Sequence, residues 1–180
     1  STANIRLYWE WTGKLMSIDG FNIYFWSSNS STDSPQIDAD NDYTSFIATY
    51  TAKVNPRLKI STVTLNSTNP TVVTIEPHNL TSGDKVKIGG VKSAAQVYMS
   101  SINNTLDADY QTVTVTGLSS FTITLGTATS STYFAGSGTV TACKYVYQIN
   151  NLTANYFYNA WIQPYRVVNT TISDDGLIVG

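Results

Sequence analysis

The sequence predicts an all-β protein, and three observations support this. The chain of 180 residues has few charged side chains, 12% of the total, but it has 12 tyrosines and is rich in threonine and valine. These residue types favour the pleated, half-buried surface of a sheet. Apolar and polar residues alternate with a period of two in several segments, as in strands that bury one face. Glycine-containing turn signals separate many of these segments.

The first predicted strands are rich in aromatic residues. Residues 4–13, NIRLYWEWTG, alternate strictly between apolar and polar side chains. Residues 18–28, IDGFNIYFWSS, repeat this pattern, and after a polar loop residues 43–54 can return as a third strand. The side chains expected to face inward are Ile5, Leu7, Trp9 and Trp11 in the first strand, and Phe21, Ile23 and Phe25 in the second.

The composition changes from about Ile60. Tryptophan disappears, threonine and valine dominate, and short strands are expected at 61–67, 71–76, 84–90, 111–117, 120–126 and 137–142. Aromatic strands resume at residues 144–152 and 155–165. This order predicts one β-sandwich, residues 1–57 and 142–180, interrupted by a small β-barrel at residues 58–141.

The two aromatic blocks resemble a fibronectin type III domain. The family's pattern around its strands E and F is met by Tyr147, Ile149, Leu152 and Tyr158, its strand-B tryptophan by Trp11, and its strand C by residues 20–25, GFNIYF. The resemblance implies an immunoglobulin-like sandwich with Trp11 and Leu152 in its core. It also implies a tyrosine corner, in which the Tyr158 hydroxyl bonds to the corner backbone. Only three residues precede the first strand, so we expect strand A to be missing or supplied from upstream.

The interrupting segment has a resemblance of its own. Residues 77–91, PHNLTSGDKVKIGGV, look like a signature common in phage tail proteins. It belongs to a small β-barrel module named for its likeness to the first catalytic cysteine half-domain of ubiquitin-activating enzymes. We expect a tight turn at Gly83-Asp84, with Val86 and Ile88 inward and Lys85 and Lys87 in water.

No set of residues in the sequence predicts catalysis. His78 is the only histidine and lacks a neighbouring nucleophile and acid, so we expect a turn residue whose ring bonds the backbone. Cys143 is the only cysteine and is expected to be a small buried apolar side chain rather than a reactive thiol. The chain is therefore predicted to have no catalytic residues and no cofactor.

The carboxylates do not form a recognisable metal site. Residues 38–42, DADND, resemble the start of a calcium loop, but Tyr43 and Thr49 stand where an EF-hand needs glycine and a carboxylate. Asp107 and Asp109 are expected at a polar strand edge. The net charge of −2 gives no reason to expect nucleic acid or an anionic membrane as a partner.

An outer aromatic face is the most informative feature for function. If strands C and F are neighbours, the outward side chains gather on one face: Tyr24, Trp26, Phe157, Trp161 and Tyr165. A bare patch of this kind would exceed the contiguous apolar surface usual in monomers. Three covers remain open: the inserted barrel folded back, a neighbouring module or subunit, or a glycan stacked on the rings and bonded to Asn159 and Gln163.

The resemblances together imply a non-enzymatic structural or adhesion module. Its expected place is the tail, fibre or baseplate-associated part of a phage or prophage virion, or otherwise outside the cell. Its expected partners are other tail proteins, neighbouring modules of the same polypeptide or a host surface glycan. The alternative is a carbohydrate-binding accessory module of a bacterial surface protein or secreted glycosidase.

Overall fold

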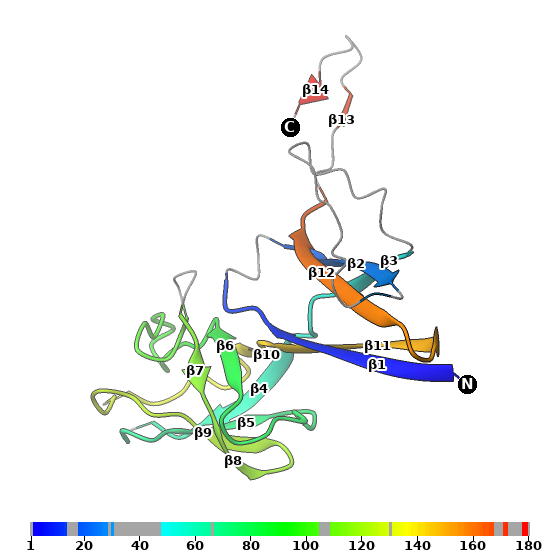
Figure 1. The fold of residues 1–180 in the computed structure, drawn as a ribbon. Helices are drawn as coiled ribbons and strands as arrows, with labels where there is room; N and C mark the ends of the chain where they lie inside the picture. The colour runs from blue at the N-terminus through cyan, green and yellow to red at the C-terminus, as the bar shows by residue number, and fades with distance from the viewer. Residues whose placement is uncertain are drawn as a thin grey trace. The chain divides into compact units, whose positions relative to one another are not determined.

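The protein is all-β, as the sequence predicts. A computed structural model describes residues 2–13, 18–28, 30, 48–65, 67–104, 109–129, 131–167, 171–172 and 178–179. Within these ranges the regular structure consists of the strands β1 to β14, paired in antiparallel sheets, with no helix (Figure 1).

The chain divides into two compact units. Unit 1 comprises residues 1–6, 15–54 and 148–180, and unit 2 comprises residues 7–14 and 55–147. These limits differ from the predicted boundaries, since residues 7–14, 55–57 and 142–147 belong to unit 2. Trp11 therefore lies in a different unit from Tyr158, although both were expected in one sandwich core.

A three-stranded antiparallel sheet holds the buried aromatic residues of unit 1. Its order is β12 (Phe157–Tyr165), β2 (Gly20–Ser28) and β3 (Ala48–Lys53), so that β2 is central (Figure 1). One face of β2 is fully buried and carries Phe21, Ile23 and Phe25. The alternation read from residues 18–28 thus gives the correct inward face.

The long strands β1 (Thr2–Glu10) and β11 (Lys144–Thr153) pair with each other and form a second sheet. In β1, half-buried and exposed residues alternate along the strand, and the half-buried set includes Ile5, Leu7 and Trp9, as predicted. Ile149 and Leu152 of β11 are buried. The short strands β13 (Thr171–Ile172) and β14 (Ile178–Val179) also pair with each other.

Tyr158 closes the corner between β11 and β12. Its hydroxyl donates a hydrogen bond to the backbone carbonyl of Thr153 at 2.8 Å. Its ring stacks on Phe25 with the ring centroids 5.2 Å apart, and Tyr50 approaches the same phenylalanine edge-on at 6.5 Å. Tyr158 therefore joins the turn backbone to the buried face of β2, which is the contact that a tyrosine corner makes.

We expect Tyr158→Phe to lower the free energy of unfolding by about 0.5–1.5 kcal/mol, the usual worth of one hydrogen bond. The substitution removes the hydroxyl that Thr153 accepts and leaves the ring stacked on Phe25. Guanidinium denaturation followed by circular dichroism measures the change. Tyr156→Phe is the matched control, because Tyr156 is 46% exposed. Equal stability of the two variants would contradict the role of the corner bond.

Unit 2 contains a seven-stranded sheet that is nearly closed into a barrel, and we call it the barrel unit. The strand order is β7-β6-β10-β4-β5-β9-β8. The strands are β4 (Leu58–Val63), β5 (Thr71–Thr74), β6 (Lys85–Gly89), β7 (Gln111–Thr112), β8 (Thr114–Gly117), β9 (Ser120–Thr122) and β10 (Thr139–Ala142). The end strands β7 and β8 are separated in the chain by Val113 alone. The backbone of Val113 forms hydrogen bonds with Gly83 and Asp84 just before β6.

Aliphatic side chains and one phenylalanine fill the interior of this sheet. The fully buried members include Ile60, Val72, Val86, Ile88, Val91, Ile102, Val113, Phe121 and Ile123. Val86 and Ile88 point inward as predicted. The expectation for Lys87 is wrong, since only 8% of this residue is exposed. Lys87 lies opposite Thr141, which is itself buried, so the outer face of the sheet is covered at this point. A lysine can be accommodated there because its long aliphatic stem packs on apolar surface.

The turn before β6 has the expected form. Gly83 adopts a φ of +95°, and the Asp84 backbone N–H donates to the carbonyl of Thr81. The Asp84 carboxylate in turn accepts the backbone N–H of Thr81 at 2.9 Å. Asn79 has a φ of +53°, a left-handed conformation that asparagine tolerates better than most residues. The two hydrogen bonds between Thr81 and Asp84 thus fix the shape of this loop.

Candidate functional site

The pairing of β2 with β12 brings the predicted aromatic residues to one face. Opposite residues in an antiparallel pair point to the same side of the sheet. Trp161 lies opposite Tyr24, Asn159 opposite Trp26, and Tyr165 opposite Gly20. The face opposite the buried Phe21, Ile23 and Phe25 therefore carries all the residues of the predicted set, and we call it the aromatic face: Tyr24, Trp26, Phe157, Trp161 and Tyr165.

Two members of the aromatic face are strongly exposed. Trp161 is 48% exposed and Phe157 is 50% exposed, while the other members are half-buried. A Cβ at Gly20 would lie 2.5 Å from the backbone carbonyl oxygen of Ala52 and 2.9 Å from Tyr165 Cε1, so glycine is required at that position. The Tyr24 hydroxyl lies 3.3 Å from the Gln163 side-chain oxygen. A polar amide thus lies beside the Tyr24 ring, and Trp161 and Phe157 are the most exposed groups of the face.

His78 has the structural role that the sequence predicts. Its Nδ1 accepts the backbone N–H of Leu80 at 3.0 Å, and its Nε2 lies 3.2 Å from the carbonyl of Ser120. This pattern requires the neutral ring with the proton on Nε2. The ring is buried and packs edge-on against Phe121 with the centroids 5.5 Å apart. Both nitrogens are therefore used to hold the backbone.

Cys143 is fully buried at the junction of β10 and β11, as predicted. Burial raises the pKa of its thiol to about 11, and nearby Lys87 only partly opposes this effect. The thiol therefore stays protonated near neutral pH, whereas the thiolate is the reactive form of cysteine. The backbone carbonyl of Cys143 accepts the Trp11 N–H at 2.8 Å, and the Cys143 N–H donates to the backbone carbonyl of Lys85. The backbone of Cys143 thus joins residue 11 to the junction of β10 and β11 within unit 2.

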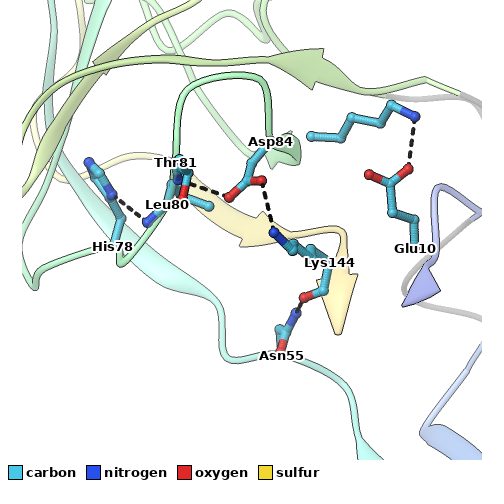
Figure 2. A network of polar contacts seen from close by, with 8 residues as sticks. Glu10, Asn55, His78, Leu80, Thr81, Asp84 and Lys144 are labelled. Carbon is cyan, nitrogen blue, oxygen red and sulfur yellow. Dashed lines mark hydrogen bonds and ion pairs between the residues drawn. The ribbon is translucent and has the colours of Figure 1, made fainter. Parts of the chain in front are cut away.

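A polar network surrounds the turn at Asp84 (Figure 2). One oxygen of the Asp84 carboxylate accepts the Thr81 N–H, and the other faces the Lys144 ammonium at 3.6 Å. The Asn55 amide donates to the backbone carbonyls of Ala142 and Lys144 at 2.9 and 2.8 Å. Asn55 thereby fixes the start of β11, so both members of the Asp84–Lys144 pair have anchored backbones.

A second ion pair lies beside this network. The Lys85 ammonium donates to the Glu10 carboxylate at 2.8 Å, the bond drawn to Glu10 in Figure 2. The same ammonium lies 4.9 Å from the centre of the Tyr110 ring. The hydrogen bond to Glu10 raises the pKa of Lys85. Exposed pairs of this kind contribute little to stability, so their main effect here is to neutralise each other's charge.

Within the described ranges, no three side chains of histidine, cysteine, aspartate or glutamate are grouped so that they could hold a metal ion. The calcium-like segment at residues 38–42 and Asp107 lie outside those ranges, while Asp109 is half-buried just before β7. The described residues also include no helix long and apolar enough to cross a membrane.

Sequence reasoning missed the importance of Asn55 and Lys144. Asn55 precedes Pro56, which is a turn signal, but nothing in the sequence shows which carbonyls its amide would meet. Nothing in the sequence marks Lys144 as a site residue either. Its carboxylate partner Asp84 is distant in sequence, and only folding brings the two together.

Comparison with known proteins leaves the family open. No known protein-family model matches the chain, and no curated protein sequence matches it.

Proposed function

We propose that this chain is a non-enzymatic structural and adhesion module of a phage or prophage tail. It would act by docking another tail protein, or a neighbouring module of its own polypeptide, on the aromatic face. The observation that carries the proposal is the exposure of Trp161 and Phe157, 48% and 50%, on the same face as Tyr24 and Trp26. The virion location rests on the resemblance of residues 77–91 to the tail-protein signature.

The aromatic face is suited to protein docking. Covering apolar surface contributes roughly 25 cal/mol for each Å² removed from water. Large aromatic side chains often provide most of the energy of an interface, because they bury much area and lose few rotatable bonds. Trp161 and Phe157 lie on a strand paired along its whole length with β2, so little ordering is needed before a partner binds.

The placements of the only histidine and the only cysteine support a non-enzymatic role. His78 uses both ring nitrogens for backbone bonds, and Cys143 is buried with a raised pKa. Histidine is the most common general base in enzymes, and cysteine is a strongly nucleophilic side chain. Each instead contributes to the packing of the barrel unit.

Carbohydrate binding at the same face is the second candidate. Asn159 and Gln163 flank Trp161 at alternate positions of β12, so their amides share its side of the strand. A tryptophan ring with adjacent amides is a suitable surface for stacking and hydrogen bonding a sugar. In that case the chain would be an accessory module of a surface protein or secreted glycosidase.

Binding measurements with the products of the flanking genes test the proposal. The purified chain is titrated calorimetrically with each product, and one of them is expected to bind. Trp161→Ala should weaken that binding by a factor of ten or more, which is about 1.4 kcal/mol. Leu118→Ala is the matched control, because Leu118 is 85% exposed and belongs to the barrel unit.

Two outcomes would contradict docking at this face. Equal binding by Trp161→Ala and the wild-type chain would exclude the aromatic face as the interface. Binding to a glycan array, lost in Trp161→Ala or Trp26→Ala and accompanied by no protein partner, would instead assign the chain to the carbohydrate-binding class.

A further inference from the structure

The barrel unit contains a groove, and no residue of the aromatic face lines it. It has a volume of 360 Å³ and lies among residues 55–58, the 78–84 loop and residues 142–146, with Tyr8 of β1 among its lining residues. Small-molecule sites usually occupy about 300–1,000 Å³. The groove is therefore large enough for one or two sugar rings.

A charged donor and a charged acceptor lie next to each other in this groove. The Asp84 carboxylate and the Lys144 ammonium are 3.6 Å apart, longer than a good charged hydrogen bond. The Asp84 side chain is 16% exposed and is held by the Thr81 N–H, while the Lys144 side chain is 50% exposed. Asn55 holds the Lys144 backbone (Figure 2). Both groups keep bonding capacity for a ligand.

The other walls of the groove are largely apolar. Leu58, Leu80 and Val146 contribute aliphatic surface, and Tyr8 contributes an aromatic ring that is 60% exposed. Exposed tyrosine rings provide a flat apolar surface with a polar tip. The groove therefore combines one polar pair with surfaces on which the C–H face of a ring can pack.

The charges of the groove favour a neutral ligand. Asp84 and Lys144 have opposite charges, and both His78 nitrogens are used by backbone groups. An ion of either sign would be attracted by one member of the pair and repelled by the other, so the pair gives no net attraction for a charged ligand. A neutral group that donates to the carboxylate and accepts from the ammonium satisfies both.

We propose that this groove binds a neutral saccharide. Two adjacent hydroxyls of a pyranose present one donor and one acceptor at the spacing of neighbouring polar atoms. One hydroxyl donates to Asp84, the other accepts from Lys144, and the ring packs its C–H face on Tyr8. The residues of this site differ from those of the aromatic face, so the two proposals can be tested separately.

NMR titration of the full chain with maltose, cellobiose, lactose and chitobiose tests this proposal. At least one disaccharide is expected to bind with a Kd of about 1 mM and to change the chemical shifts of the Thr81, Asp84 and Val146 amides. Asp84→Asn should weaken binding tenfold or more, because it removes the charge while its side-chain oxygen can still accept the Thr81 N–H. Tyr8→Ala should also weaken binding, and Tyr8→Trp should restore it.

Trp161→Ala is the control and should bind as the wild-type chain does. Tyr8 is exposed, so its variants remain informative even if Asp84→Asn fails to fold. The proposal is overturned if none of the four sugars shifts these amides at about ten times the expected Kd. It is also overturned if both Asp84→Asn and Tyr8→Ala still bind the sugar. Shifts confined to β12 would place the site elsewhere, and groove amides that respond only to peptides would exclude a saccharide as the ligand.

Discussion

Phe121→Ala is expected to lower the free energy of unfolding of the barrel unit by about 3–5 kcal/mol, the usual cost of removing a buried phenylalanine side chain. Phe121 has no exposed surface and belongs to the core that β4, β5, β6 and β10 share. Its ring also supports the edge of His78, whose nitrogens hold the loop before β6. The cavity left by alanine would therefore remove packing from both the core and the loop.

Hydrogen exchange at the amides of β5 and β9 measures this effect in the barrel unit itself. Leu118→Ala is the control, because Leu118 is 85% exposed in the turn between β8 and β9. The control should change stability by less than about 0.5 kcal/mol. A similar loss in both variants would show that the position of Phe121 in the core has been misassigned.

Gly138→Ala is expected to destabilise the barrel unit by about 2–5 kcal/mol. The first contribution is the left-handed backbone, since Gly138 has a φ of +86° and such a conformation costs alanine about 1–2 kcal/mol. The second is steric, because the new Cβ would lie 2.6 Å from Val91 Cγ2 and 3.1 Å from Ile60 Cδ1. Overpacking of this kind adds about 1–3 kcal/mol.

Gly136→Ala separates the two contributions. Gly136 also has a left-handed φ, +78°, but a Cβ there would meet no atom within 4 Å. It should therefore lose only the backbone contribution, about 1–2 kcal/mol. Guanidinium denaturation of both variants gives the difference. If Gly138→Ala were no less stable than Gly136→Ala, the close approach of residue 138 to Val91 would be refuted.

Local patterns in the sequence predict much of this fold. The alternation in residues 18–28 identifies the buried face of β2, because a period of two is a property of the strand itself. The Gly83-Asp84 turn follows from local backbone preferences in the same way. The structural roles of His78 and Cys143 were also predicted correctly. The sequence shows no catalytic partner near either residue, which favoured a role in the turn for His78 and in the core for Cys143.

Lys87 shows where alternation fails. The pattern assumes that one face of a strand is buried and the other is in water, but the outer face of β6 is covered where Lys87 lies opposite Thr141. The limits of the units differ for a related reason. β1 and β11 are long strands that run through both units, so composition alone does not locate the point of transition.

The amino-acid sequence by itself determined the all-β class, the inward faces of the main strands and the residues of the aromatic face. It could do so because side-chain periodicity and turn chemistry act over a few neighbouring residues. Only the tertiary structure decided the register that sets Trp161 opposite Tyr24, and the groove in which Asp84 meets Lys144. Both depend on segments far apart in the chain, whose pairing is set by the packing of the whole fold.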